Sequence, residues 1–385
     1  MKIAKLVATL AVGVGLTTAV SAETLKIGII GPLTGAAAPW GQANAEGAKL
    51  YAKRYNDAGG IDIGGKKYQI EIISYDDQYS TPGAVAAYNR LVNQDGVKYI
   101  DVIAGISTMA IKSFAKDDKV VAITAGYITD ELDPVNSQYM YRMWGVPQDF
   151  FPPLYDTVAK LRPERRVALI NPNDESARVS GEIAAAAYKK NGYTILINDL
   201  YERSQKDFAP LVTKILGAKP DLVDLCTTAP AQAALLVRML REFGYKGQIL
   251  ISGSTVWKEV VAGAGKENAE GVMNVLYVDP ANEGYKKFVA DYVKQVGSEP
   301  NEVVAGYSDG VNFLIQSIAA SGAANDTSKF EEGFFKAAKA PFTSVQGEKL
   351  TISGKEKYGV QHQIDAYRYL GVIHNGEPQV IGKFQ

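Results

Sequence analysis

The sequence predicts an α/β protein made of two doubly wound lobes. From Glu23 onward, short apolar segments alternate with helical segments of roughly ten to eighteen residues, which is typical of a parallel sheet covered on both faces. Two extended segments with Gly or Pro, 141–147 and 271–278, interrupt this alternation. We interpret both as crossings between lobes, because they separate complete runs of alternating elements. The chain is therefore expected to visit lobe one, lobe two and lobe one again.

Each lobe is predicted to hold four main parallel strands and the helices between them. The expected strands are 25–31, 68–75, 102–104, 120–124, 166–171, 194–198, 222–225 and 249–252. The main expected helices are 41–57, 82–94, 176–191, 208–217, 230–243 and 285–296. The first helix is expected to end at Gly59-Gly60, because glycine adopts the left-handed conformation of a helix C-cap without a steric penalty. The second is expected to begin with Pro82 in its first turn. Alternating residues at 363–369 and at Val372 predict C-terminal strands and a third crossing.

Residues 1–22 are predicted to be a cleavable secretory signal. Lys2 and Lys5 precede an apolar run of about fifteen residues, and Val20-Ser21-Ala22 places small side chains before Glu23. The run is shorter than the about 20 residues of a membrane-spanning helix. No cysteine follows the cleavage site, so we expect a mature chain outside the cytoplasm without a lipid anchor. An amphipathic or buried first helix is the alternative.

The mature length is consistent with two lobes. Removing 22 of the 385 residues leaves 363, which is more than one hydrophobic core usually serves. We expect lobe one to comprise 23–144 plus 278–358, and lobe two to comprise 145–277 plus 359–385.

Composition argues against several functional classes. The formal net charge is −1, or −3 without Lys2 and Lys5, so no surface for nucleic acid is expected. Cys226 is the single cysteine, which excludes an intrachain disulfide, and we expect it to be buried. Only His362 and His374 are available for a histidine-based metal site or a Ser-His-Asp arrangement. We expect neither a metal nor a cofactor.

Motifs of common enzymes are missing from the sequence. The first expected strand lacks the G-x-G-x-x-G spacing of dinucleotide sites, and no G-x-S-x-G elbow occurs. Gly263-Ala264-Gly265-Lys266 lacks the distal glycine and the following Ser or Thr of a phosphate loop. The carboxylate pair Asp76-Asp77 is explained at least as well by a solvated turn. We predict a binding protein rather than an enzyme.

The loops after the expected strands are the candidate ligand site, because ligands of open parallel sheets bind at the carboxyl ends of the strands. Small residues and hydroxyls occur there at expected helix starts, in 31–41, 105–108 and 125–127. Helix N-termini offer N–H groups and a positive dipole end, which suit a carboxylate. Ser107 and Thr108 are equally compatible with plain N-caps.

Several segments resemble the leucine/isoleucine/valine-binding proteins of bacterial ABC importers. They span essentially the whole mature chain, in the family's order: 27–35, Trp40-Gly41, 56–67, Tyr75-Asp76-Asp77, Lys206-Asp207-Phe208 and 269–272. The resemblance implies a type I periplasmic binding protein with two Rossmann-like lobes, joined by three hinge strands that close on a ligand. It also implies a monomer in the periplasm that delivers a small carboxylate to an ABC permease in the inner membrane. An extracytoplasmic ligand-sensing subunit is the alternative.

The resemblance also implies contacts to the ligand in lobe one. Family members hold the ligand carboxylate with a hydroxyl and backbone amides after the third and fourth strands, and a tryptophan covers the ligand side chain. The corresponding positions are Trp40, Ser107, Thr108, Ala125, Gly126 and Tyr127.

Lobe two departs from the amino-acid-binding pattern. A carboxylate that would meet the ligand ammonium is expected after 249–252, but the chain has Gly253-Ser254-Thr255-Val256-Trp257. Two tyrosines that the family pattern places in this lobe are also missing. Ser176-Ala177-Arg178 stands where one is expected, and the other is absent near Thr228. Burying an ammonium without a charged partner costs several kcal/mol. We therefore hypothesise a ligand without an α-amino group, with an aromatic or other organic acid as the leading candidate and an amino acid as the alternative.

We expect a set of lobe-two residues to contact such a ligand. Aromatic side chains would surround a ring or branched chain, and Arg178 would meet a second anionic or polar group. The alternative ligand, an amino acid, requires Glu259 to reach the site. The expected contacts beyond lobe one are Trp144, Arg178, Thr228, Ser254, Trp257 and Tyr277.

Overall fold

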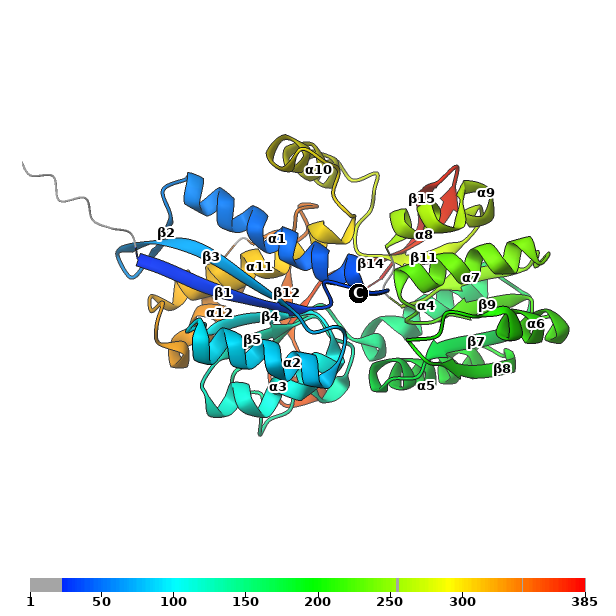
Figure 1. The fold of residues 1–385 in the computed structure, drawn as a ribbon, viewed down its shortest axis with the longest axis horizontal. Coiled ribbons are helices and arrows are strands. Elements are labelled where there is room, and N and C mark those ends of the chain that lie inside the picture. The colour runs from blue at the N-terminus through cyan, green and yellow to red at the C-terminus, as the bar shows by residue number, and fades with distance from the viewer. Residues whose placement is uncertain (1–22, 254–255, 341, 385) are drawn as a thin grey trace, which may run out of the picture.

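The computed structural model describes residues 23–253, 256–340 and 342–384. Within them, the chain forms two α/β lobes that lie side by side, each with a sheet at its centre (Figure 1). The predicted signal at 1–22 lies outside the described residues. No helix in the described ranges is long and apolar enough to cross a membrane.

The first lobe is built on a sheet to which the described residues contribute eight strands, in the order β12-β13-β6-β5-β4-β1-β3-β2. The strand order reverses at β1, which pairs in parallel with β3 on one side and β4 on the other. This reversal is the switch point of a doubly wound sheet. The strands are β1 (Glu23–Gly31), β2 (Ile61–Ile63), β3 (Lys66–Asp76), β4 (Tyr99–Val102), β5 (Val121–Thr124), β6 (Met140–Met143), β12 (Thr351–Ser353) and β13 (Gln363–Asp365).

Helices cover both faces of the first sheet. Apolar residues of α1, α10, α11 and α12 form one core, and those of α2 and α3 form another on the opposite face. The predicted entry to α2 is confirmed, since the Ser80 side chain accepts a hydrogen bond from the Gly83 N–H. The helices are α1 (Ala38–Asp57), α2 (Thr81–Asn89, continued by a π-turn at Arg90–Gln94), α3 (Gly105–Asp117), α10 (Glu283–Val296), α11 (Val303–Ser321), α12 (Phe330–Lys339) and α13 (Lys355–Tyr358).

The second lobe repeats this plan. Its sheet runs β15-β14-β11-β10-β9-β7-β8 and reverses order at β7, which pairs in parallel with β8 and β9. The strands are β7 (Arg166–Pro172), β8 (Thr194–Tyr201), β9 (Leu222–Leu225), β10 (Gln248–Ile251), β11 (Met273–Leu276), β14 (Arg368–His374) and β15 (Glu377–Phe384). The helices are α4 (Pro147–Leu161), α5 (Glu175–Lys190), α6 (Ala209–Ala218), α7 (Pro230–Glu242), α8 (Trp257–Ala264) and α9 (Lys266–Ala269).

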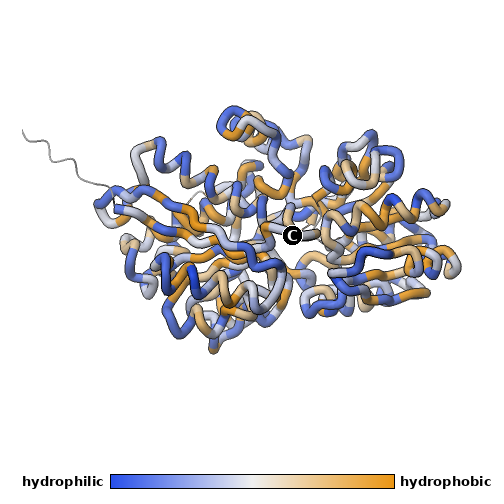
Figure 2. The backbone as a smooth tube through the Cα atoms, viewed as in Figure 1, coloured by the Kyte–Doolittle hydropathy of each residue, from blue (hydrophilic) through white to orange (hydrophobic). Residues whose placement is uncertain are grey.

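Burial follows the strands. Apolar residues gather along the sheets inside each lobe, and hydrophilic residues lie mainly on the outer helices and turns (Figure 2). The predicted burial of Cys226 is confirmed, with no exposed surface on the residue. Central parallel strands are buried on both faces, which explains why they appear in the sequence as short continuous apolar runs.

Three connections join the lobes. The chain passes from the first sheet to the second at 144–146, returns at 277–282, and passes again at 366–367. The first two overlap the predicted crossings 141–147 and 271–278 only in part, because β6 and β11 occupy the earlier residues of those segments. The third differs from the predicted division, because β13 pairs with β6 in the first sheet although 359–385 was assigned to lobe two. The alternation at 363–369 breaks at Ala366-Tyr367, two apolar residues in succession, and this break lies between β13 and β14 where the chain changes sheet.

One predicted strand is displaced. The structure places β4 at Tyr99–Val102, whereas the sequence predicted 102–104. The prediction left out Asp101 because aspartate is rare in buried strands, but Asp101 is 5% exposed and lies inside this central strand. Burial raises the pKa of Asp101 to about 7, and the nearby Asn44 side chain partly opposes this rise.

Candidate functional site

A cavity lies between the two lobes at the carboxyl ends of the parallel strands, where doubly wound sheets bind ligands. Its empty space, including the open mouth, is about 470 Å³. The first lobe contributes the start of α1 and the loops after β3, β4 and β5. The second lobe contributes the segments that follow β7, β8 and β9. The lining residues are Trp40, Tyr79, Ile103, Ala104, Gly105, Ala125, Gly126, Tyr127, Ser176, Arg203, Thr227, Tyr277 and Tyr307.

The N-terminus of α3 opens into this cavity through Gly105. No side chain caps the helix, so its first turn presents N–H groups and the positive end of the helix dipole. Gly126 packs against it, because a Cβ on Gly126 would lie 2.6 Å from the Gly105 Cα and 2.0 Å from Glu131 Oε1. Glycine is therefore required at 126 for the two loops to approach each other. The result is a wall of exposed backbone suited to an anionic group.

Arg203 is the cationic side chain among the described lining residues. It follows β8 in the second lobe and is fixed from two sides. Its Nε donates to Asp174 Oδ2 in the same lobe, and its Nη2 donates across the cleft to the Tyr79 hydroxyl at 3.3 Å. Its Nη1 is buried and has no hydrogen-bond partner among the described residues. One N–H group of a rigidly held guanidinium is therefore available for an acceptor on a ligand.

Aromatic rings form much of the remaining wall. The ring centroids of Trp40 and Tyr79 are 6.4 Å apart, and those of Tyr277 and Tyr307 are 6.1 Å apart. The hydroxyl oxygens of Tyr127 and Tyr277 lie 3.1 Å from each other. Burial raises the pKa of Tyr127 and of Tyr307 well above the usual range, so both hydroxyls remain protonated. The wall matches a flat apolar body with polar edges.

Two lining residues have left-handed backbones. Tyr79 has φ +53° and Thr227 has φ +51°, and Trp144, behind the aromatic wall, has φ +64°. Such conformations of non-glycine residues cost about 1–3 kcal/mol and cluster at functional sites. In this protein they place two side chains from opposite lobes in the same cavity wall.

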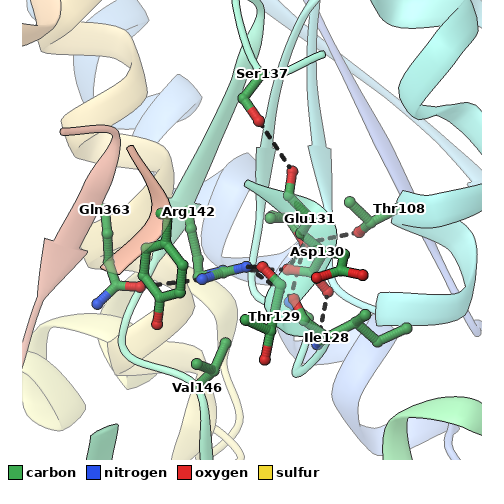
Figure 3. A network of polar contacts seen from close by, with 12 residues as sticks. Thr108, Ile128, Thr129, Asp130, Glu131, Ser137, Arg142, Val146 and Gln363 are labelled. Carbon is green, nitrogen blue, oxygen red and sulfur yellow. Dashed lines mark hydrogen bonds and ion pairs between the residues drawn. The ribbon is translucent and has the colours of Figure 1, made fainter. Parts of the chain in front are cut away.

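A buried ion pair supports the loop that follows β5. Arg142 Nε lies 3.3 Å from Glu131 Oε2, and neither side chain is exposed. Arg142 Nη2 donates to the carbonyls of Ile128 and Thr129 at 2.8 and 2.9 Å, and its Nη1 donates to Gln363 at 3.2 Å (Figure 3). Burial raises the pKa of Glu131, and Arg142 opposes that rise. The network ties this loop to the first crossing and to β13.

The family of this chain follows from a match over most of its length. A family model described as "Periplasmic binding protein" matches residues 24–368. The chain belongs to this family. Its two doubly wound lobes are those of the type I periplasmic binding proteins, so the fold class and the family expected from the sequence motifs are both confirmed.

Individual relatives agree with this assignment. An amino acid binding protein of Pseudomonas aeruginosa is 30% identical over 340 residues, which is 87% of each chain. The Leu/Ile/Val-binding protein of Escherichia coli K12 is 25% identical over 73% of this chain and 75% of that one. A leucine-binding protein from Thermotoga maritima has TM-score 0.79 at 19% identity and covers 94% of this chain and 99% of its own. A solute-binding protein from Rhodopseudomonas palustris in complex with benzoate has TM-score 0.79 at 18% identity, with 94% and 96% covered.

The structure of this periplasmic binding protein brings several predicted site residues together in the cavity wall: Trp40, Ala125, Gly126, Tyr127 and Tyr277. Trp144 lies directly behind them, with its ring centroid 4.7 Å from that of Tyr277 and 5.0 Å from that of Tyr307.

The predicted hydroxyls of lobe one point elsewhere. Ser107 Oγ donates to Asp77 Oδ2 at 2.6 Å, and Thr108 Oγ1 donates to the Ala104 carbonyl at 3.0 Å. Thr108 Oγ1 also lies 2.7 Å from Thr124 Oγ1. Both residues are fully buried and neither lines the cavity. Their hydroxyls hold the α3 region together, so any contribution to a ligand comes from the backbone of this turn.

Four predicted residues of lobe two are also placed away from the cavity or not placed. Arg178 is exposed, and its Nε donates to Asn173 Oδ1 at 2.9 Å. Thr228 is buried beside Thr227 but does not line the cavity, and Trp257, 3% exposed, packs in the second-lobe core. Ser254 lies outside the described residues. Glu259, the residue considered for an ammonium, is exposed on α8 and is not part of the wall.

Sequence reasoning missed several lining residues of this binding protein. Tyr79 and Arg203 follow the carboxyl ends of β3 and β8. The rule that ligands bind at the carboxyl ends of parallel strands therefore indicated the correct edge of each sheet, although it did not single out these two residues. Tyr307 belongs to α11, which follows the second crossing. No sequence motif near Tyr307 indicates that it contributes to a ligand site. Gly105 belongs to the predicted loop 105–108 but was not singled out as a contact, and the remaining missed residues are Ile103, Ala104, Ser176 and Thr227.

Proposed function

We propose that this protein captures a small aromatic carboxylate between its lobes and delivers it to an ABC permease. The observation that carries the proposal is the charge of the cavity wall. None of the described lining residues is acidic, whereas Arg203 brings a buried guanidinium with an unpaired Nη1. An α-ammonium group would lose its hydration there without gaining a counter-charge, which costs several kcal/mol. A carboxylate without an amine avoids that cost.

The anchor for the carboxylate is the N-terminus of α3 together with Arg203. These groups come from different lobes, so an anion held by both stabilises the closed arrangement. The rings of Trp40, Tyr79 and Tyr307 then cover the body of the ligand. Ala125, Gly126, Tyr127 and Tyr277 complete the proposed contacts. Benzoate and 3,4-dihydroxybenzoic acid, named for two solved structures of similar fold, have this shape and charge.

The proposed place of action is the periplasm, reached after removal of residues 1–22. The mature chain begins at Glu23, where β1 starts in the structure. We propose that it acts as a monomer that diffuses between the site of ligand capture and the permease. Closure of two lobes over a ligand gives the permease a surface that differs between loaded and empty protein.

A thermal-shift panel on the mature chain tests the proposal. The panel contains benzoate, hydroxybenzoates, phenylacetate, leucine, isoleucine and valine. A ligand at 100 times its Kd stabilises the folded protein by about 2.7 kcal/mol, which moves the melting temperature visibly. We expect shifts with ring acids and none with the three amino acids. Shifts confined to the amino acids would refute the proposed ligand class, and turnover of a bound acid detected by mass spectrometry would refute a pure binding role.

A further inference from the structure

A second buried guanidinium lies just behind the cavity wall. Arg368 is the first residue of β14, next to the third crossing, and is 2% exposed. Its Nε, Nη1 and Nη2 have no hydrogen-bond partner in the described part of the chain. No carboxylate of the described residues forms an ion pair with it either. Arginine remains charged in proteins, so this cation is buried without an anion.

Aromatic faces surround this cation. The guanidinium carbon lies 4.2 Å from the ring centroid of Tyr277, 5.1 Å from that of Trp144 and 5.6 Å from that of Phe150. Such faces attract a cation, but they satisfy none of its N–H groups. The side chain is therefore held in place by packing, and none of its three nitrogens forms a hydrogen bond of normal geometry with the described residues.

A pair of tyrosines in the cavity wall lies beside Arg368. Tyr127 and Tyr277 both line the cavity, and their hydroxyl oxygens lie 3.1 Å apart. Burial raises the pKa of Tyr127, and the nearby Arg368 opposes that rise, so the guanidinium lies close to this hydroxyl. An acceptor group on a ligand that inserts between the two hydroxyls would take hydrogen bonds from both. It would also bring a negative charge next to the unpaired cation.

The two arginines serve different ends of the wall. Arg203 lies over the ring of Tyr79, and Arg368 lies over Tyr277, Trp144 and Phe150. Among the described residues no ring contacts both cations. Arg203 therefore lines the cavity beside the first-lobe loops, whereas Arg368 lies behind the wall on the hinge side.

We propose that Arg368 is a specificity-determining residue that selects aromatic acids carrying a second carboxylate. This inference rests on the proposed function, which assigns the first carboxylate to Arg203 and α3. The second carboxylate replaces the contact between the Tyr127 and Tyr277 hydroxyls, accepts from both, and compensates the buried charge of Arg368. A monocarboxylate leaves that charge uncompensated and is held at one end only.

Calorimetric titration of the mature protein with benzoate and with the three benzenedicarboxylate isomers tests this inference. We expect wild type to bind at least one dicarboxylate about 10- to 100-fold more tightly than benzoate, the range for a hydrogen bond to a charged group. Arg368→Met should abolish this preference, so that the dicarboxylates lose their 10- to 100-fold advantage over benzoate in the variant. Arg203→Met, the matched control at the other end, should weaken both classes of acid.

Melting of the unliganded proteins separates a ligand role from a structural one. Replacing an unpaired buried charge with an apolar side chain of similar size should keep or raise the melting temperature. A lower melting temperature for Arg368→Met together with an unchanged preference would overturn the inference. Equal wild-type affinity for benzoate and all three dicarboxylates would also overturn it while leaving the proposed function standing. Absence of binding to every aromatic acid would remove both.

Discussion

Arg203 of the second lobe lies over the ring of Tyr79 of the first lobe, with its guanidinium carbon 4.4 Å from the ring centroid. The contact spans the cleft beside the cavity that both residues line. Asp174 fixes the far side of the guanidinium, so its position is determined within the second lobe before the lobes meet. One side chain therefore bridges the two lobes and lines the cavity in which we propose that the ligand is held.

Arg203→Gln should weaken the binding of an aromatic acid about 10- to 100-fold, because it removes a charge-assisted hydrogen bond from a desolvated site. Arg178→Gln is the matched control. Arg178 follows β7 in the same lobe, but its side chain is exposed to solvent and donates a hydrogen bond to Asn173. Isothermal titration calorimetry with benzoate measures both. Equal affinities for wild type and Arg203→Gln would show that the carboxylate binds elsewhere.

Ser107→Ala should lower stability rather than affinity. Burial raises the pKa of Asp77, and the hydrogen bond that the Ser107 hydroxyl donates to this carboxylate opposes the rise. Removing the donor from a buried acceptor costs about 1–3 kcal/mol, which thermal or denaturant unfolding detects. Benzoate affinity should remain within twofold, because the side chain does not line the cavity. A large loss of affinity with unchanged melting would restore Ser107 as a direct ligand contact.

Gly126→Ala should be strongly destabilising. The new Cβ would lie 2.0 Å from Glu131 Oε1, inside the buried network that holds the cavity loop. Overpacking of this kind costs about 1–3 kcal/mol or more. Gly217→Ala is the control, because Gly217 lies in α6 with nothing within 4 Å of the new Cβ. That substitution should stabilise the protein by about 0.5–1 kcal/mol through helix propensity. Equal melting temperatures for the two variants would contradict the packing seen at Gly126.

Glu302 should make stability depend on pH. Glu302 is 1% exposed at the start of α11, and this burial raises its pKa to about 8. The Lys258 charge and the backbone amides of Trp257 and Lys258, all from the other lobe, oppose the rise. The unfolded chain releases this proton near pH 4.5, whereas the folded chain keeps it until about pH 8. The folded state therefore binds more protons between these values, and stability falls as pH rises through this window.

Glu302→Gln should remove this contribution. Its melting temperature should exceed that of wild type by several degrees at pH 8 and match it near pH 4.5. Glu299→Gln, at a side chain that is 73% exposed, serves as the control and should follow wild type. The buried Asp101 and Asp224 titrate in both proteins, so the difference between variant and wild type is the informative quantity. A difference independent of pH would contradict the assignment to Glu302.

Much of the fold could be predicted because parallel strands that are buried on both faces appear in the sequence as short continuous apolar runs. The predicted strands 25–31 and 222–225 lie within or coincide with β1 and β9. The errors arose where tertiary context overrides the local pattern. The predicted strand began at residue 102 although the buried Asp101 lies inside β4, and the predicted second lobe began at residue 359 although β13 still pairs in the first sheet.

The site was predictable only to the level of its loops. Trp40 and Gly126 follow strand ends, and the general rule for parallel sheets places them at the cleft. The direction of a side chain depends on partners distant in sequence. Ser107 turns toward Asp77, and Arg203 rather than Arg178 reaches the cavity. No local pattern contains that information, because each outcome depends on contacts formed by the folded chain.

The central claim is that the cavity accepts a carboxylate with an aromatic body and rejects its α-amino counterpart. Calorimetric titration of the mature protein with 3-phenylpropionate and with phenylalanine tests it most directly, since the two compounds differ only by the ammonium group. A wall with Arg203 and without a described acidic residue predicts measurable binding of 3-phenylpropionate and at least tenfold weaker binding of phenylalanine. Tighter binding of phenylalanine would contradict the account.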